Sequence, residues 1–97
     1  MSNKKSETIK ITLPEDIMRG VYANAMSVSH TKEEFLLDFL NLFQPQGIVN
    51  ARVIMSPSHF KRVITTLSEN LKKYEDEYGE VEEQEQIERK KYDREKK

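Results

Sequence analysis

The stretch EFLLDFLNLF, residues 34–43, decides the fold of this chain, because it is the longest apolar run in a sequence of 97 residues that is 34% charged. As a helix, it would start at a capping box of Thr31 and Glu34 and would place Glu34, Asp38 and Asn41 on one polar stripe. As a strand, it would have two apolar faces, each with a single polar exception, Asp38 or Asn41. Periodicity alone leaves both structures open.

Three other segments have the pattern of β-strands. Residues 7–13 alternate isoleucine and leucine with polar residues, the period of two that a half-buried strand shows. Residues 20–29 begin at a glycine and place small residues on one face, and residues 48–55 resume a β-like pattern after the breaker QPQG at 44–47. With residues 34–43 as a strand, these segments predict a sheet of four strands.

The best-marked boundary in the sequence is the start of a long helix, predicted over residues 57–78. Ser56 has the position of an N-cap, and Pro57 has the first helical position, where its missing N–H costs nothing. Gly79 is a natural stop. Apolar residues recur along the helix at alternating spacings of four and three, a 3.5 repeat typical of helices that pack along one another. They are Phe60, Ile64, Leu67, Leu71, Tyr74, Tyr78 and Val81.

Residues in both halves of the chain carry a family resemblance. They are Tyr22, Asn24, Glu34, Phe35, Asp38, Phe39, Arg52, Ser56, Pro57, His59, Lys61, Asn70, Tyr74, Glu75 and Gly79. Through them, residues 7–79 resemble a family of small bacterial and archaeal proteins catalogued as domain of unknown function 3467. The resemblance implies a polar hairpin tip before the E-F-x-x-D-F segment, which favours the strand for residues 34–43. It implies no activity and no functional residue.

We therefore expect an α+β fold in which a small antiparallel sheet of about four strands precedes one long C-terminal helix, in a single domain at residues 1–79. Residues 80–97 are expected to be a separate charged tail. Its first part, 80–88, has five acidic and no basic side chains, and its second part, 89–97, has six basic and two acidic ones. The tail has too few apolar residues to offset the entropy of ordering, which predicts disorder or a frayed helix.

A strand with two apolar faces needs cover on both sides. One helix of about 33 Å, at about 1.5 Å per residue, covers one face of a small sheet and leaves the other as an apolar patch. Such patches mark association surfaces, so we expect a homodimer or a higher even oligomer, with a self-shielded monomer as the alternative. The expected interface residues are Phe35, Leu36, Leu37, Phe39, Leu40, Leu67, Leu71 and Tyr74.

Several polar residues stand out against this apolar pattern. Asp38 lies among leucines, where a carboxylate must be paired, neutralised or exposed at an edge, and we expect an ion pair with Arg52 on the neighbouring strand. Ser56 is expected to have a structural role as a helix cap. The candidate contacts for a phosphate or carboxylate at the same helix start are His59, Lys61 and Arg62.

The sequence contains no motif that names a reaction, and we predict no catalytic residue, no cofactor and no metal site. The chain has no cysteine, and its two histidines and three glycines form neither a convincing metal-ligand cluster nor a phosphate-binding loop. The polar N-terminus and the lack of a run of about 20 apolar residues argue against secretion and membrane spanning. A cytoplasmic protein is expected.

Three functional classes remain. We favour a non-enzymatic, homo-oligomeric protein-interaction module, which binds itself and, as a further option, another protein. The first alternative is a nucleic-acid-associated regulatory protein that uses basic side chains of the helix and tail, although the body of the chain is neutral. The second is a chaperone similar in outline to the export chaperone SecB, with strands followed by a long helix.

Overall fold

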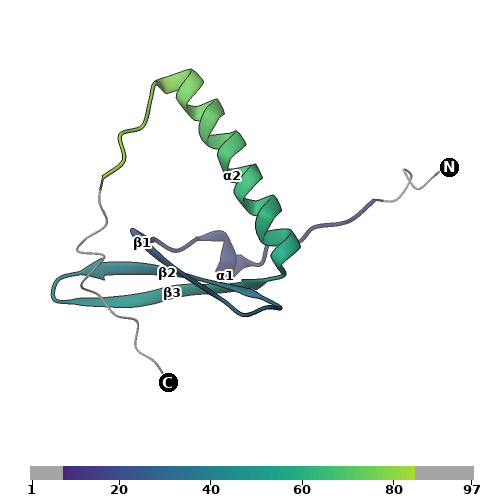
Figure 1. Cartoon of the computed structure of the whole chain (residues 1–97), viewed down its shortest axis with the longest axis vertical. Helices are drawn as coiled ribbons and strands as arrows, with labels where there is room; N and C mark the ends of the chain where they lie inside the picture. The colour runs from purple at the N-terminus through teal and green to yellow at the C-terminus, as the bar shows by residue number, and fades with distance from the viewer. Residues whose placement is uncertain (1–7, 85–97) are drawn as a thin grey trace.

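The structure is a computed structural model that describes residues 8–84. In chain order, the elements are α1 (Glu15–Met18), β1 (Ala25–His30), β2 (Phe35–Phe43), β3 (Gln46–Met55) and α2 (Pro57–Tyr78). The strands form an antiparallel sheet in the order β1-β2-β3, and α2 rises from one end of it (Figure 1). The expected α+β fold is confirmed, but the described part of the chain has three strands where four were predicted.

The apolar run at residues 34–43 is a strand, β2, in the middle of the sheet. It pairs with β1 from Phe35 to Leu40 and with β3 along its whole length. The residues that suggested a helix start instead close the turn between β1 and β2. The hydroxyl of Thr31 accepts hydrogen bonds from the backbone N–H groups of Glu33 and Glu34, both at 3.2 Å. A side chain that can cap a helix therefore stabilises a turn here.

A tight turn at residues 44–45, which contains a cis peptide bond before the proline, joins β2 to β3. Only two residues of the QPQG breaker leave the ladder, so β3 begins at Gln46, two residues earlier than predicted. Between Phe39 and Leu40 the pairing register shifts by one residue. Asn50 is the extra residue on β3 and forms a β-bulge.

The predicted first strand is wrong. Residues 8–13 lie outside every strand of the described chain, and residue 7 lies outside the described residues. Alternating side chains give a segment an apolar face, but a strand also needs a neighbour that pairs with its backbone N–H and C=O groups. The side chains of Ile9 and Ile11 are almost fully exposed instead.

A short helix, α1, follows this segment and was not predicted from the sequence. The C=O group of Pro14 accepts hydrogen bonds from the N–H groups of Ile17 and Met18, both at 3.0 Å. Glu15 and Asp16 place negative charge in the first turn, where it is favourable. The signal was present in the sequence, since a proline followed by two acidic residues is a common helix start.

β1 begins at Ala25, five residues later than predicted. The backbone N–H of Asn24 still donates to the C=O of Leu40 at 2.9 Å, but side-chain amides provide the other bonds that hold this segment. The side-chain nitrogen of Asn24 donates to the C=O of Leu42 at 3.1 Å, and its side-chain oxygen accepts from the N–H of Leu42 at 2.8 Å. Asn50 holds the same segment by donating to the C=O of Tyr22 at 2.6 Å. These bonds satisfy backbone groups without extending the strand.

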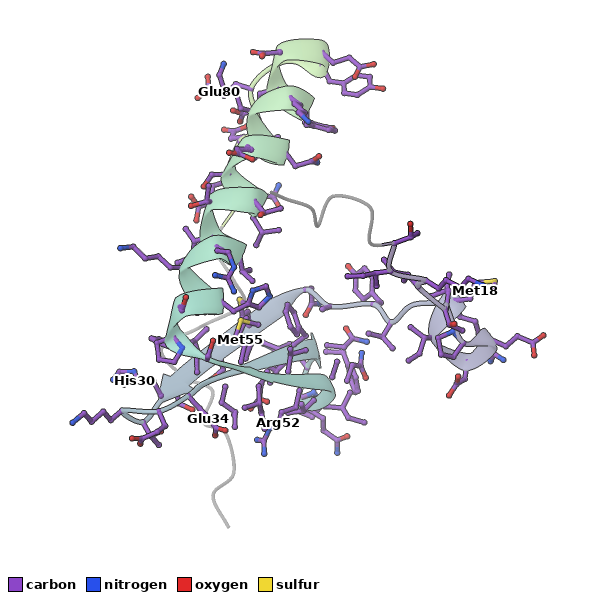
Figure 2. All side chains as sticks on the ribbon, turned by 90° about the vertical axis from the view of Figure 1, so that its right-hand side faces the viewer. Met18, His30, Glu34, Arg52, Met55 and Glu80 are labelled. Carbon is purple, nitrogen blue, oxygen red and sulfur yellow. The ribbon has the colours of Figure 1, made fainter. Side chains whose placement is uncertain are left out.

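The two faces of the sheet have different compositions, because successive side chains of a strand point to opposite faces. The helix-side face contains Phe35, Leu37 and Phe39 of β2, Met26 and Val28 of β1, and Val53 and Met55 of β3. The far face contains Leu36, Asp38 and Leu40 of β2, Ala25, Ser27 and Ser29 of β1, and Arg52 and Ile54 of β3. Figure 2 shows Met55 at the base of α2 and Arg52 on the opposite side of the sheet.

The core of the described chain is small. Its buried residues are Ala25, Leu37, Asp38 and Leu40, all on β1 and β2. No residue of α2 is buried. A small domain needs most of its apolar surface buried to be stable. A single copy of this chain buries much less apolar surface than such a domain is expected to bury.

The helix α2 has the predicted bounds, residues 57–78. The hydroxyl of Ser56 accepts a hydrogen bond from the N–H of His59 at 3.2 Å. At the other end, Gly79 has a φ of 100°, which favours glycine, and its N–H donates to the C=O of Glu75 at 2.9 Å. Residues 80–84 are in neither a helix nor a strand, and the rest of the predicted tail lies outside the described residues.

Replacing Ser56 with alanine is expected to lower the free energy of unfolding by about 1 kcal/mol, because the N–H of His59 loses its acceptor. Thr66→Ala, at an exposed position in the middle of α2, is the control and is expected to have a neutral or slightly stabilising effect, since alanine has the higher helix propensity. Urea denaturation followed by circular dichroism measures both variants. Equal effects of the two changes would show that the cap does not contribute.

Candidate protein-interaction surface

The largest apolar feature on the described helices is a stripe along one face of α2. Its side chains recur every three or four residues, the spacing of one helix face. They are Phe60, Ile64, Leu67, Leu71, Tyr74 and Tyr78, which we term the α2 stripe. Phe60 is half-buried and the other five are exposed, Leu67 by 62% and Tyr78 by 68%.

The α2 stripe meets the sheet at its first member. The rings of Phe60 and Phe35 stack with their centroids 4.0 Å apart and their planes 4° from parallel, and the ring of His30 lies 5.3 Å from that of Phe35. Beyond this contact, α2 rises away from the strands (Figures 1 and 2). The α2 stripe and the helix-side face therefore adjoin at Phe60 and diverge from there.

The helix-side face of the sheet continues the apolar surface. Val28 and Val53, which flank the central strand on either side, remain 44% and 41% exposed. Phe43 and Ile48, near the tip of the β2–β3 hairpin, are also exposed. A surface of large apolar side chains that extends over a sheet and a helix is typical of an association site.

The residues predicted for an oligomer interface fall on three surfaces. Phe35, Leu37 and Phe39 lie on the helix-side face. Leu67, Leu71 and Tyr74 belong to the α2 stripe. Leu36 and Leu40 lie on the far face, where Leu40 is buried. The structure thus joins the first two groups at Phe60 and separates the third from them.

The predicted set omitted exposed apolar residues of both the α2 stripe and the helix-side face. Ile64 and Tyr78 belong to the same 3.5 repeat as Leu67, so the sequence pattern could have included them. Val28 and Val53 join the helix-side face through the strand register, which the sequence does not reveal.

The far face contains an ion pair between Asp38 and Arg52, the two residues that the sequence analysis paired. They lie opposite each other in the register. The guanidinium donates from Nε to Oδ1 at 2.7 Å and from Nη2 to Oδ2 at 3.0 Å. Asp38 is completely buried, and the side chain of Arg52 is 51% exposed. A two-point hydrogen bond to a planar guanidinium offsets much of the desolvation of such a carboxylate.

The pair keeps Arg52 charged. Its hydrogen bond to Asp38 and their mutual attraction raise the pKa of Arg52 above its ordinary value. Because the pKa of Arg52 is higher in the folded chain than in the unfolded one, the stabilisation is complete at every pH below the unfolded value, which lies far above neutrality, and is lost only as the pH rises through the folded value. The guanidinium therefore contributes no pH dependence near neutrality, as suits a structural pair.

The candidate anion contacts lie around the first turns of α2. His59 and Arg62 are three residues apart and share one side of the helix, while Lys61 does not face either of them. Arg62 donates to the hydroxyl of Ser58 at 3.3 Å, and the N–H of His59 donates to Ser56. Part of the hydrogen-bonding capacity at this helix start is thus taken by the chain's own serines.

The described residues contain neither a metal-ligand cluster nor a membrane helix. Between residues 8 and 84, no group of three or more histidine, aspartate or glutamate side chains could hold a metal ion. The ring of His30 lies next to that of Phe35. Over the same residues, neither helix has the length and apolar content needed to cross a membrane.

Comparison with known proteins gives a family match and no individual relative. The family described as "Protein of unknown function (DUF3467)" matches residues 1–83. The matched region contains all three strands and α2, and hence both the α2 stripe and the Asp38–Arg52 pair. No curated protein and no solved structure matches the chain.

Proposed function

We propose that this chain, which belongs to the DUF3467 family of proteins of unknown function, is a non-enzymatic interaction module that assembles with further copies of itself. The α2 stripe is the observation that supports the proposal, because five of its six apolar side chains are exposed in the single chain. Covering apolar surface is favourable by about 25 cal/mol per Å². Covering the α2 stripe in an assembly therefore contributes favourably to association, against the entropy that association costs.

A second copy of the chain is the simplest cover for this surface. It supplies a helix of the same length with the same stripe, and two identical stripes can pair about a two-fold axis. The 3.5 repeat of the α2 stripe is the repeat of helices that pack along one another. Burial between copies would also supply apolar contacts that the small core of one chain lacks.

Replacing Leu67 with glutamate tests the proposal. Leu67 is 62% exposed in the single chain, so the change removes little packing within one copy. In an assembly the same position would bury an unpaired charge, which is strongly unfavourable. We expect the wild type to sediment as a dimer or higher even oligomer and Leu67→Glu to shift it to a monomer. Sedimentation velocity gives the mass, and circular dichroism checks that α2 remains helical.

Thr66→Glu is the matched control, because Thr66 lies next to Leu67 but outside the α2 stripe and undergoes the same change of charge. It is expected to leave the assembly intact. A wild type that stays monomeric at micromolar concentration would contradict the proposal, as would an assembly that both glutamate variants leave unchanged.

A further inference from the structure

The charges of α2 oppose its own dipole. Its first turn has no acidic residue and its last turn has no basic one. Instead, Lys61 and Arg62 follow the start, and Glu75, Asp76 and Glu77 lie at the end. A lone helix is stabilised by the reverse order, with acidic residues at the start and basic residues at the end. The observed order becomes favourable when another helix places its oppositely charged end alongside.

We propose that two copies of the chain pair through their α2 stripes in antiparallel orientation, with the basic start of each helix beside the acidic end of the other. This inference rests on the proposed self-assembly and adds its orientation, its register and the contacts that select them. The occupant of the apolar surface is thus a second α2 helix from the same chain.

The α2 stripe fits this orientation in one register. A two-fold axis midway between Leu67 and Leu71 places Leu67 of each copy opposite Leu71 of the other. The same axis pairs the remaining members, Ile64 with Tyr74 and Phe60 with Tyr78. Every member of the α2 stripe then has an apolar partner, as the alternating spacing of a two-helix contact requires.

The residues beside the stripe support the same orientation. One flank consists of Lys61, Ser68 and Glu75, each directly after a stripe residue. In an antiparallel pair, this flank of one helix lies against the same flank of the other helix. Lys61 of each copy then meets Glu75 of the other, and the two copies of Ser68 meet at the centre. A parallel pair would instead bring the two acidic ends together, which is destabilising. Charge complementarity therefore selects the antiparallel pair.

The antiparallel arrangement would also cover part of the exposed helix-side face of the sheet. Phe60 is the point at which α2 meets Phe35 on the helix-side face. A second helix whose Tyr78 lies level with Phe60 brings its distal end to that face, where Val28 and Val53 are exposed. One helix of the second copy would thus cover both the α2 stripe and part of the helix-side face of the first.

Distances between spin labels distinguish the two orientations, and the chain has no native cysteine to interfere with labelling. Glu69 lies on the side of α2 away from the stripe and near the proposed axis, and Ser58 lies near the helix start. In the antiparallel pair, labels on Glu69→Cys lie at the same level, whereas labels on Ser58→Cys are separated by about 33 Å along the axis, at about 1.5 Å per residue. In a parallel pair, the two distances would be similar.

The outcomes separate the orientation from self-assembly. A clearly longer distance for Ser58→Cys than for Glu69→Cys supports the antiparallel pair. Similar distances at both sites in an assembled dimer overturn the orientation and leave self-assembly intact. No coupling between labels, together with a monomeric mass for the wild type in sedimentation, overturns both proposals.

A charge swap tests the flanking contact independently. Lys61→Glu and Glu75→Lys each bring α2 closer to the charge order that its dipole favours, so neither is expected to reduce its helicity. In the antiparallel pair, each single change creates like-charged contacts at two symmetry-related places and is expected to weaken association roughly tenfold. The double variant Lys61→Glu/Glu75→Lys restores the contact and is expected to associate within about threefold of the wild type.

Lys73→Glu is the control for this experiment, because it changes the charge by the same amount away from the stripe and its flanks. Glu75 also accepts a hydrogen bond from the N–H of Val81 at 2.9 Å, so the double variant is judged against both single variants. If the double variant loses as much association free energy as the two single variants together, the antiparallel orientation is overturned.

Discussion

Replacing Arg52 with methionine is expected to lower the free energy of unfolding several times more than replacing Asp38 with asparagine, although both changes break the same ion pair. In the first variant, the carboxylate of Asp38 stays completely buried but loses the counter-charge that offsets much of its desolvation. In the second, the guanidinium that remains is half exposed and is solvated by water. Asparagine also keeps the shape of the side chain and one acceptor oxygen.

Urea denaturation of both variants, at one fixed protein concentration, measures this asymmetry. The double variant Arg52→Met/Asp38→Leu is expected to recover most of the loss, because it buries no unpaired charge. Arg62→Met is the matched control for removing an arginine, since Arg62 lies on the exposed surface of α2. If Asp38→Asn were the more harmful change, Asp38 would have a role beyond this pair.

Replacing Phe60 with alanine is expected to lower the free energy of unfolding by about 2–3 kcal/mol, somewhat less than for a fully buried phenylalanine, because Phe60 is half-buried. The loss includes the stacked contact with Phe35, whose ring lies 4.0 Å away. This contact is also what fixes the start of α2 against the helix-side face. The variant is therefore expected to loosen the helix as well as the sheet.

Phe43→Ala is the matched control for Phe60→Ala. Phe43 lies at the end of β2, is 49% exposed and makes no contact with α2 that resembles the Phe35–Phe60 stack. It is expected to cost less than about 1 kcal/mol. Thermal unfolding followed by circular dichroism compares the two variants, and equal losses would show that the stack has no special role in joining the helix to the sheet.

The features that the sequence predicted correctly depend on local chemistry. Ser56 and Pro57 are adjacent to the helix start that they define, and Gly79 adopts the positive φ at the stop. These caps act within one turn, so the bounds of α2 follow from neighbours in the chain. The Asp38–Arg52 pair was also predictable, because a carboxylate among leucines needs a basic partner on the next strand.

The features that the sequence did not reveal depend on contacts between distant residues. Residues 8–13 alternate correctly for a strand, but no described strand pairs with them. Asn24 bonds to a residue 18 positions away and Asn50 to one 28 positions away, and these bonds delay the start of β1. The helix α2 meets the sheet through the stack of Phe60 on Phe35, a contact between different elements, so the exposure of the α2 stripe could not be read from its period.

The β-bulge at Asn50 determines where this fold tolerates changes in chain length during evolution. The bulge separates the pairing register at the hairpin tip from the register of the rest of β3. A residue gained or lost around the turn at 44–45 therefore changes only the loop and the first residue pairs of the β2–β3 ladder. A residue gained or lost between Ala51 and Arg52 would turn Arg52 away from Asp38 and would move the start of α2 to the other face. Length variation among relatives is therefore expected at the hairpin tip and not in the second half of β3.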